Sequence, residues 1–339
     1  MRYFVTGSAG FIGFHLCRRL LAGGHLVDGF DAMTPYYDPA LKQRRLGLLA
    51  MTNGFRNTIG ALEDMSALER AYQAARPDVV VHLAAQAGVR YSLENPRAYI
   101  QSNLVGTFNL MECARLRPPR HLLMASTSSV YGESFDVPFY ETNQTDQPIT
   151  LYSATKKSTE VMGHSYAHLW SLPTTIFRFF TVYGPWGRPD MAPQKFLEAI
   201  EAGRPIEVFN YGDMRRDFTY IDDLIEAIVR LVDCVPMAGE GIGDKDTVSP
   251  VAPFRIVNIG RGAPAQLMDF IAALERTTGK SAQRNYLPMQ KGDVPITFAN
   301  CDLLEGLTGY RPSTSIEVGV RALVDWFLAY RAEQKGQMT

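Results

Sequence analysis

The stretch VTGSAGFIGFHL, residues 5–16, decides the fold class of this chain. Its glycines, Gly7, Gly10 and Gly13, lie between an apolar strand pattern at residues 2–6 and an amphipathic helix pattern that follows directly. In such a loop one glycine makes the turn, a second lets backbone N–H groups approach a pyrophosphate, and a third lets the helix pack closely on the strand. The N-terminus of the helix adds the positive end of its dipole. We therefore expect a dinucleotide-binding strand–loop–helix unit here.

An acidic residue at the end of the next strand pattern supports this expectation. The spacing is G-x-x-G-x-x-G rather than G-x-G-x-x-G, so the glycines alone are weak evidence. Asp31 ends the pattern HLVDGFD, roughly 20 residues downstream, where an acid binds the adenosine ribose hydroxyls and disfavours a 2′-phosphate. No arginine follows Asp31 immediately, which favours NAD over NADP. The alternative, a glycine-rich turn without a ligand, fits this context poorly.

Apolar strand patterns alternate with helix patterns through the first half of the chain. DVVVHLAA, RHLLMASTSS and PTTIFRFF are almost continuously apolar before their polar ends, which is typical of parallel strands covered on both faces. Helix patterns separate them at 11–24, 67–77, 96–116 and 152–170. We therefore predict a Rossmann-type, doubly wound α/β fold.

The pattern loosens after about residue 184. We expect an NAD-binding domain at 1–184 and a smaller C-terminal α/β lobe for the nucleotide sugar at 185–339. Helices are predicted near 192–202, 220–233, 265–278 and 315–332, and a strand at 255–260 could return to the first sheet. The segment 236–253 is rich in Gly, Pro and charge, and we expect an exposed, mobile loop.

Composition excludes several classes of partner. The 339 residues carry 34 basic and 35 acidic side chains, so bulk charge does not favour binding to nucleic acid or to a membrane surface. The four cysteines are scattered without a C-x-x-C pair, which disfavours a disulfide framework or a zinc site and favours a reducing, cytoplasmic location. No targeting segment and no apolar run of ~18–20 residues is visible. We expect no metal.

A tyrosine and a lysine share one face of the helix pattern at 152–170. Tyr152 and Lys156 are four residues apart, and a run of hydroxyls at 126–129 ends a strand pattern about 25 residues upstream. A free tyrosine has a pKa of about 10, and a neighbouring ammonium would lower it toward the range of a useful base. Alone, this pattern is a surface helix and the hydroxyls are turn caps. Beside a dinucleotide loop, it indicates a catalytic base.

Together these motifs resemble the extended short-chain dehydrogenases/reductases of the nucleotide-sugar epimerase and dehydratase type. TGSAGFIG, HLAAQAGV, SNLVGTFNL, STSSVYG, YSATKK, RFFTVYGPWGRPDMA and RRDFTYIDDL follow the order of that family over nearly the whole chain. The resemblance implies that Thr127 and Tyr152 flank the reacting hydroxyl, and that Lys156 holds the cofactor ribose and tunes Tyr152. It implies that NAD is lined by Gly7, Gly10, Phe11, Ile12, Gly13, Asp31, Asp64, Leu83, Ala84, Ala85, Asn103, Ser126, Tyr152 and Lys156. Helices 97–117 and 152–170 carry apolar faces that could pair across a two-fold axis in a homodimer, as in related dimers, and the alternative is that these faces are buried within the same chain.

The end of the hydroxyl strand limits the chemistry that the resemblance allows. Related 4,6-dehydratases carry acid and base residues after the threonine, and decarboxylating relatives carry a glutamate, where this chain has Ser128 and Ser129. Without a carboxylate, elimination lacks its acid–base pair. Simple epimerisation at C4 remains, in which the sugar is oxidised, turned and reduced again so that NAD is regenerated.

The segment RFFTVYGPWGRPDMA resembles that of UDP-glucuronate 4-epimerases. The resemblance implies that Arg188 pairs with the carboxylate of the sugar, assisted by Thr181, Ser128 and Ser129. The alternative for Arg188 is a salt bridge within its loop. The resemblance further implies that Arg216, Lys291 and Asp293 hold the UDP moiety, although related chains usually have a second arginine where this one reads QKGD.

The alternatives for the function stay open at this point. One is an epimerase of the UDP-glucose/UDP-galactose type, although some of these carry a lysine near the NAD ribose where this chain has Ala87. Others are a decarboxylating or C5-epimerising relative, and a catalytically silent NAD-binding sensor. The intact set of Thr127, Tyr152 and Lys156 argues against the sensor.

Overall fold

A seven-stranded, all-parallel sheet forms the centre of the computed structural model, which describes residues 1–336. The strand order is β11-β6-β5-β4-β1-β2-β3. Its members are β1 (Arg2–Thr6), β2 (Leu26–Asp31), β3 (Phe55–Ile59), β4 (Val79–His82), β5 (His121–Thr127), β6 (Thr174–Phe179) and β11 (Phe254–Ile259). Every residue of β4, β5 and β6 is buried, as expected for strands covered on both faces. The Rossmann-type fold predicted from the sequence is confirmed.

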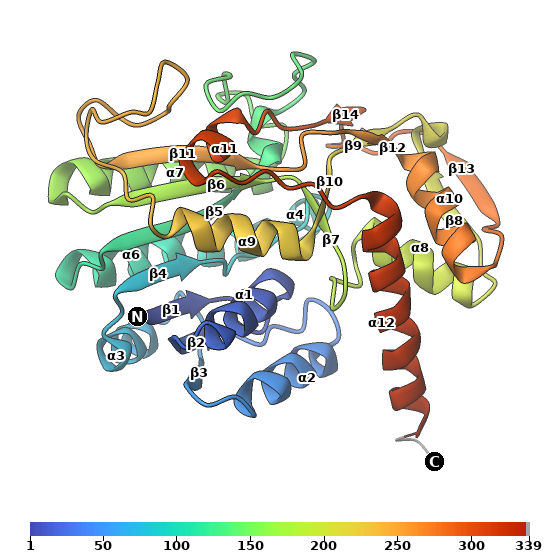
Figure 1. Cartoon of the computed structure of the whole chain (residues 1–339), viewed down its shortest axis with the longest axis horizontal. Helices are drawn as coiled ribbons and strands as arrows, with labels where there is room; N and C mark the ends of the chain where they lie inside the picture. The colour runs from blue at the N-terminus through green and yellow to red at the C-terminus, as the bar shows by residue number, and fades with distance from the viewer. Residues whose placement is uncertain (337–339) are drawn as a thin grey trace.

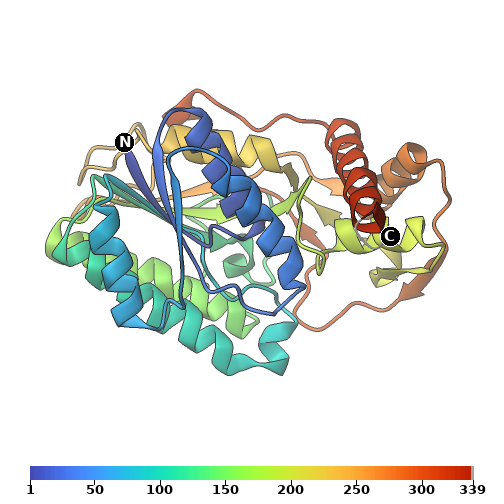
Figure 2. The same ribbon diagram turned by 90° about the horizontal axis from the view of Figure 1, so that it is seen from below.

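Helices cover both faces of this sheet (Figure 2). On one side lie α1 (Phe11–Ala22), α2 (Pro39–Ala50) and α9 (Ile221–Leu231); on the other lie α3 (Met65–Ala75), α6 (Gly106–Leu116) and α7 (Leu151–Trp170). The strand order reverses between β1 and β4, so a crevice opens at the carboxyl ends of these strands. The glycine loop follows β1 and therefore lies at that crevice.

A smaller lobe lies beside the carboxyl ends of the strands (Figure 1). It contains α8 (Ala192–Glu201), α10 (Leu267–Thr278), α12 (Ile316–Gly336), β8 (Ile206–Phe209) and β13 (Arg284–Leu287). Of these elements, α8, α10, α12 and β8 share a separate apolar core, which includes Phe196, Phe270 and Leu323. Short strands connect the lobes: β7 (Thr181–Tyr183), β9 (Arg215–Arg216), β10 (Phe218–Tyr220), β12 (Ala265–Gln266) and β14 (Ile296–Thr297).

The chain returns to the large sheet after it has entered the smaller lobe. The strand at Phe254–Ile259 pairs in parallel with β6, and α9 and α11 (Asp302–Thr308) contribute to the core beneath the sheet. A division of the chain at residue 184 stays a prediction, and three segments beyond it pack on the first lobe.

One helix expected from the sequence is divided. Residues 96–116 were predicted as a single helix, but the structure has α5 (Pro96–Tyr99), the π-helical turn η1 (Ile100–Val105) and then α6; α4 (Tyr91–Glu94) precedes them. A π-turn inserts an extra residue into the helical spiral and often lies at a functional site. Here the turn contains Asn103, which is buried and hydrogen-bonded to the loop after β4.

The expected exposed loop at 236–253 is only partly exposed. Residues 237–245 are exposed, as predicted. The prediction was wrong for the part that follows, because Asp246 forms a buried ion pair with Arg255 of β11, with side-chain exposures of 1% and 4%. Thr247 also bonds the backbone of Ile256 through its hydroxyl. These contacts fix the second half of the loop to the edge of the sheet.

Candidate active site

The glycine loop forms a close-fitting cradle at the crevice. Gly7 has a φ of 76°, and a Cβ atom there would lie 2.8 Å from the backbone nitrogen of Ala84. A Cβ atom on Gly13 would collide with the carbonyl oxygen of Gly7. Helix α1 begins at Phe11 without a side-chain cap, so its first N–H groups remain available to an anion. This cradle fits the pyrophosphate of a dinucleotide.

Asp31 is fixed beside this cradle by the main chain. Its Oδ2 accepts a hydrogen bond of 3.0 Å from Ala9 N, and its Oδ1 accepts one of 2.8 Å from Met33 N. The carboxylate is therefore held at the end of β2, where it could reach ribose hydroxyls. Asp64, in contrast, caps helix α3 through Ala67 N at 3.0 Å.

Two buried residues predicted to line NAD use their side chains for hydrogen bonds within the protein. Asn103 donates to Gln86 O at 3.1 Å and to Thr155 Oγ1 at 3.0 Å, and its Oδ1 accepts from Gln86 N at 2.8 Å. Ser126 donates to Glu160 Oε1 at 2.5 Å. Both side chains position the crevice walls. Their contacts with the cofactor stay predictions.

The predicted base and its neighbouring hydroxyl meet. Thr127 is the last residue of β5, and Tyr152 lies in the first turn of α7, which begins with a capping box between Thr150 and Ser153. The Thr127 side chain lies close enough to Tyr152 to lower the pKa of the phenol, and Lys156 follows one turn later with only 3% of its surface exposed. The hydroxyl, phenol and ammonium predicted from the sequence therefore lie together.

The electrostatics of this group differ from the expectation in one respect. Burial raises the pKa of Tyr152 above its ordinary value, while the hydrogen bond with Thr127 and the charge of Arg188 act in the opposite direction. Burial also lowers the pKa of Lys156 to about 8, opposed by Glu160. Thr127 and Arg188 are the groups that lower the pKa of Tyr152 in the chain by itself, and the expected effect of Lys156 together with NAD stays a prediction.

Arg188 lies at the same crevice but already has a partner. Its Nε donates to Asp190 Oδ1 at 3.0 Å and its Nη2 to Oδ2 at 2.5 Å. Tyr36, from the loop after β2, donates to Asp190 Oδ2 at 2.9 Å. The salt bridge considered as an alternative for Arg188 is thus present, and it occupies one edge of the guanidinium. Neither Tyr36 nor Asp190 was predicted.

The predicted carboxylate-assisting hydroxyls frame this region. Ser128 and Ser129 belong to the short helix η2 (Ser128–Tyr131), and both are partly exposed. Ser129 donates its N–H to Thr127 Oγ1 at 3.2 Å. Thr181 begins β7, is partly exposed and donates its N–H to the carbonyl of Asp217 at 3.0 Å.

The predicted nucleotide-binding residues are only partly brought together. Arg216 donates to Asp293 Oδ1 at 2.7 Å and to Pro295 O at 3.1 Å, whereas Lys291 is exposed. A Cβ atom on Gly292 would lie 2.8 Å from Thr150 Cγ2, so the segment 291–295 covers the start of α7. Arg216 and Asp293 therefore form one ion pair, and Lys291 is not part of it.

A buried arginine that the sequence did not reveal joins the two sides of the crevice. Arg45 of α2 has no exposed surface. It donates to Ala9 O in the glycine loop at 2.9 Å, to Tyr37 OH at 2.8 Å and to Trp186 O at 2.5 Å. A basic residue within the sequence LKQRRLGLL gave no signal, because basic residues in helices are usually solvated.

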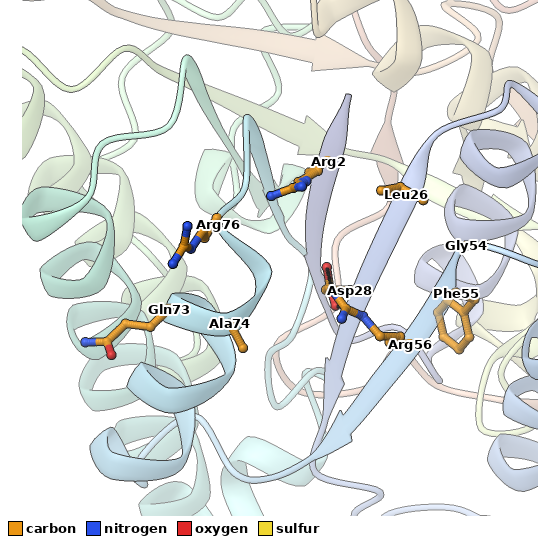
Figure 3. A pocket seen from close by; sticks show the side chains of 9 residues that line it. All are labelled: Arg2, Leu26, Asp28, Gly54, Phe55, Arg56, Gln73, Ala74 and Arg76. Atoms are coloured by element: carbon orange, nitrogen blue, oxygen red, sulfur yellow. Dashed lines mark hydrogen bonds and ion pairs between the residues drawn. The ribbon is translucent and has the colours of Figure 1, made fainter.

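An open cavity lies elsewhere (Figure 3). It has a volume of about 710 Å³ and lies at the amino ends of β1, β2 and β3, opposite the crevice. Its lining is Arg2, Leu26, Asp28, Gly54, Phe55, Arg56, Gln73, Ala74 and Arg76. None of the predicted site residues is among them. Within residues 1–336 no cluster of three His, Cys, Asp or Glu side chains could hold a metal, and no helix is long and apolar enough to cross a membrane.

Comparison with known proteins agrees with this geometry. The model of a family described as the NAD dependent epimerase/dehydratase family matches residues 3–240. A probable UDP-glucuronate 4-epimerase of Rhizobium meliloti is 57% identical over 330 residues, which are 96% of this chain and 97% of that protein. UDP-glucuronate 4-epimerase 4 of Arabidopsis thaliana is 41% identical over 336 residues, 98% of this chain and 76% of that protein.

A solved structure is similar over the whole fold. It is the UDP-glucuronic acid 4-epimerase from Bacillus cereus in complex with UDP-glucuronic acid and NAD, with a TM-score of 0.87 and 32% sequence identity. The match covers 97% of this chain and 100% of that chain.

Proposed function

The chain belongs to the NAD dependent epimerase/dehydratase family, and from this premise we propose that it interconverts UDP-glucuronate and UDP-galacturonate with NAD as its cofactor. The observation that carries the proposal is the meeting of Thr127, Tyr152 and Lys156 beside the glycine loop, with Arg188 close enough to influence Tyr152. This arrangement supports hydrogen removal from a carbon that bears a hydroxyl, on a sugar that also bears a carboxylate.

Each side chain of the group has a role in the proposed reaction. Tyr152, as the phenolate, takes the proton of the C4 hydroxyl, and Thr127 holds that hydroxyl in place by a hydrogen bond. Bound NAD supplies the hydride acceptor and later returns the hydride to the opposite face of C4. Lys156 holds the cofactor ribose and keeps positive charge near the phenolate. After the keto sugar has turned, Tyr152 returns the proton to the new C4 oxygen.

The carboxylate needs control of its own. A 4-keto uronate is a β-keto acid, and it loses CO₂ readily when its C5–carboxylate bond lies perpendicular to the keto plane. We assign the orientation of the carboxylate to Arg188, assisted by Thr181, Ser128 and Ser129. The charged guanidinium gives the strongest hydrogen bonds of this set.

The small lobe would hold the nucleotide. We propose that Arg216 binds the diphosphate and that Lys291 and Asp293 lie near the uridine. The pairing of Arg216 with Asp293 supports a shared position for these residues. The same proposal includes the residues that contact NAD, which are Gly7, Phe11, Ile12, Asp31, Asp64, Leu83, Ala84, Ala85, Asn103 and Ser126. We also propose that the protein is a cytoplasmic homodimer.

Specific observations disfavour most of the alternative functions. Decarboxylating and dehydrating relatives use carboxylates after the threonine, and Ser128 and Ser129 stand there in this chain. An epimerase of neutral sugars has no need of an arginine whose charge reaches the base, as that of Arg188 does. A silent NAD sensor has no need of a buried lysine beside the phenol.

The decisive experiment is product analysis by NMR with UDP-glucuronate and no added cofactor. We expect UDP-galacturonate to form and no pentose. Tyr152→Phe should keep its NAD but lose at least about 100-fold in kcat, since general base catalysis contributes typically 10²–10⁴-fold. Formation of UDP-pentose, or turnover of UDP-glucose alone, would replace the proposed function with one of the alternatives. Near-normal turnover by Tyr152→Phe with NAD bound would refute the role of the phenol.

A further inference from the structure

Arg188 is held from one side by a carboxylate and a phenol that come from opposite walls of the crevice. Asp190 lies two residues further along the loop after β7, and Tyr36 lies in the loop after β2. The side chains of Arg188 and Asp190 are 20% and 23% exposed, so water screens their pair only partly. The Arg188 guanidinium also lies over the ring of Tyr36, 5.7 Å from its centroid. All three groups are therefore fixed relative to one another.

The pairing leaves one edge of the guanidinium free. Asp190 accepts hydrogen bonds from Nε and Nη2 of Arg188. Nη1 of Arg188 donates no hydrogen bond to any of residues 1–336. A guanidinium has five N–H groups in a rigid plane, so the edge formed by Nη1 and Nη2 can still bind a second carboxylate in bidentate fashion. The plane of that second carboxylate is then set by Asp190.

Tyr36 is itself fixed by close packing that leads back to the base. A Cβ atom on Gly88 would lie only 2.5 Å from Tyr36 OH, so the backbone after β4 closely abuts the phenol. Ring contacts continue from Tyr36 to Tyr91 at 4.9 Å, to Tyr99 at 6.2 Å and to Tyr152 at 6.0 Å. The orientation of Asp190 is thereby tied to the position of Tyr152.

We propose that Asp190 and Tyr36 are positioning residues that fix the plane of Arg188, so that its free edge holds the sugar carboxylate close to the keto plane and prevents loss of CO₂. This inference rests on the proposed function and adds the source of its product selectivity. Neither residue needs to touch the sugar. Asp190 also neutralises the charge of Arg188, which makes recognition depend on the direction of the N–H groups rather than on net charge.

The side reaction that this arrangement prevents is the loss of CO₂ from the 4-keto uronate. In the 4-keto uronate the bond between C5 and the carboxylate carbon breaks, CO₂ leaves, and the electron pair forms the enolate of the C4 ketone. A proton from solvent then adds to C5 and gives the UDP-4-keto-pentose. The hydride held by the reduced cofactor either returns to C4, giving a UDP-pentose, or stays on the cofactor as NADH. Both products are measurable.

The test compares two equivalent substitutions in two similar ion pairs. Asp190→Asn removes the charge and one of the two acceptor positions, because an amide cannot accept from both Nε and Nη2. Asp28 makes the same bidentate pair with Arg56, with Nε–Oδ1 at 2.9 Å and Nη2–Oδ2 at 3.2 Å, at the cavity far from the crevice (Figure 3). Asp28→Asn is therefore the matched control.

We expect Asp190→Asn to raise the ratio of UDP-pentose plus UDP-4-keto-pentose to UDP-galacturonate by about tenfold or more, equivalent to about 1.4 kcal/mol of lost selectivity. Tyr36→Phe should raise it less, Asp190→Glu should restore part of the selectivity, and Asp28→Asn should match the wild type. NAD content of each purified variant shows that it is folded.

The outcomes separate this inference from the proposed function. If the wild type makes UDP-galacturonate and both Asp190→Asn and Tyr36→Phe keep the wild-type product ratio, the inference is wrong while the function stands. If Asp190→Asn instead binds UDP-glucuronate more tightly with an unchanged ratio, Asp190 is a competitor of the substrate and the inference is also wrong. If the wild type converts no uronate, the proposed function itself has failed.

Discussion

At the scale of single residues, burial shifts the pKa values of Tyr152 and Lys156 in opposite directions. The pKa of the phenol is raised, and the pKa of the ammonium is lowered to about 8. When the pair has lost one proton, that proton comes mostly from Lys156. The reactive arrangement, in which Tyr152 is a phenolate and Lys156 keeps its proton, is therefore the less populated one. Two such coupled groups titrate as a unit, so the pH profile belongs to the pair.

A pH profile tests this coupling. In the wild type, kcat/KM should rise with pH and level off at about pH 8, because above that pH the share of the reactive arrangement is constant. In Lys156→Met no lysine proton is lost, so kcat/KM should continue to rise beyond pH 8 toward the raised pKa of Tyr152. Each pKa unit by which Tyr152 lies above Lys156 lowers the share of the reactive arrangement about tenfold. If kcat/KM of Lys156→Met levels off at the same pH as that of the wild type, Lys156 is not the group whose titration determines the pH profile.

The residues that sequence patterns identified and those they missed differ in a physical respect. Thr127, Tyr152 and Lys156 lie at strand ends and helix turns whose spacing is local, so the sequence brings them close to one another by itself. Tyr36 and Asp190 are 154 positions apart and meet only because two loops from different lobes close on each other. Asp190, two residues after Arg188, was the one available signal, and an aspartate in a polar loop is ordinarily solvated.

At the scale of elements, the sequence predicted the long and periodic segments and missed the short ones. Helix α7 and strands β1, β2, β4, β5 and β6 lie where their patterns placed them. The connecting strands β7, β9, β10, β12 and β14 have only two or three residues each, too few for a period to be visible. The π-turn at Ile100–Val105 was also invisible, because its cause is a tertiary contact of Asn103.

Asn103 should link the stability of this turn to cofactor binding. Asn103→Ala would leave both backbone groups of the partly buried Gln86 without their partner, which costs up to about 1–3 kcal/mol. At about 2–4 °C per kcal/mol for a chain of this size or somewhat smaller, Tm should fall by roughly 2–12 °C. NAD content after purification should fall too, because Gln86 directly follows the segment Leu83–Ala85 at the glycine loop.

A partial deletion serves as the control for this prediction. Thr155→Ala removes the bond from Asn103 Nδ2 to Thr155 Oγ1 and the bond of 2.8 Å from Thr155 Oγ1 to Tyr152 O, and it leaves Gln86 satisfied. Its Tm and NAD content should lie between those of the wild type and Asn103→Ala. Equal values for Asn103→Ala and the wild type would show that the π-turn is maintained without this side chain.

At the scale of the whole molecule, the crevice is closed by contacts that cross between the lobes. Tyr36 meets Asp190, Arg45 meets Trp186, and the guanidinium of Arg90 lies 4.9 Å from the ring centroid of Phe209 in β8. The contacts begin in helix α2 or in a loop at the carboxyl edge of the sheet, and they end in the smaller lobe or the loop leading to it. Substrate selectivity is thus a property of how the lobes meet.

The outer face of α6 and α7 carries exposed apolar side chains. The two helices lie side by side on one face of the sheet (Figure 2). They expose Phe108, Val161 and Leu169 to 46%, 56% and 64%. Neighbouring apolar side chains of this size favour burial against a partner, and a two-fold axis lets one face serve both subunits. This supports the proposed homodimer.

The double substitution Phe108→Glu and Val161→Glu should convert a dimer into a monomer, since charged side chains buried without partners in an apolar interface cost several kcal/mol. Sedimentation velocity at micromolar concentration measures this directly as a halving of the mass. Val318→Glu places the same charge on α12, where Val318 is 60% exposed, and should leave the mass unchanged. Tyr152 lies at the other end of α7 from Leu169, so the monomer should retain NAD even where its activity falls. A wild-type monomer, or a double variant that stays dimeric with NAD bound, would show that this face is not the contact between subunits.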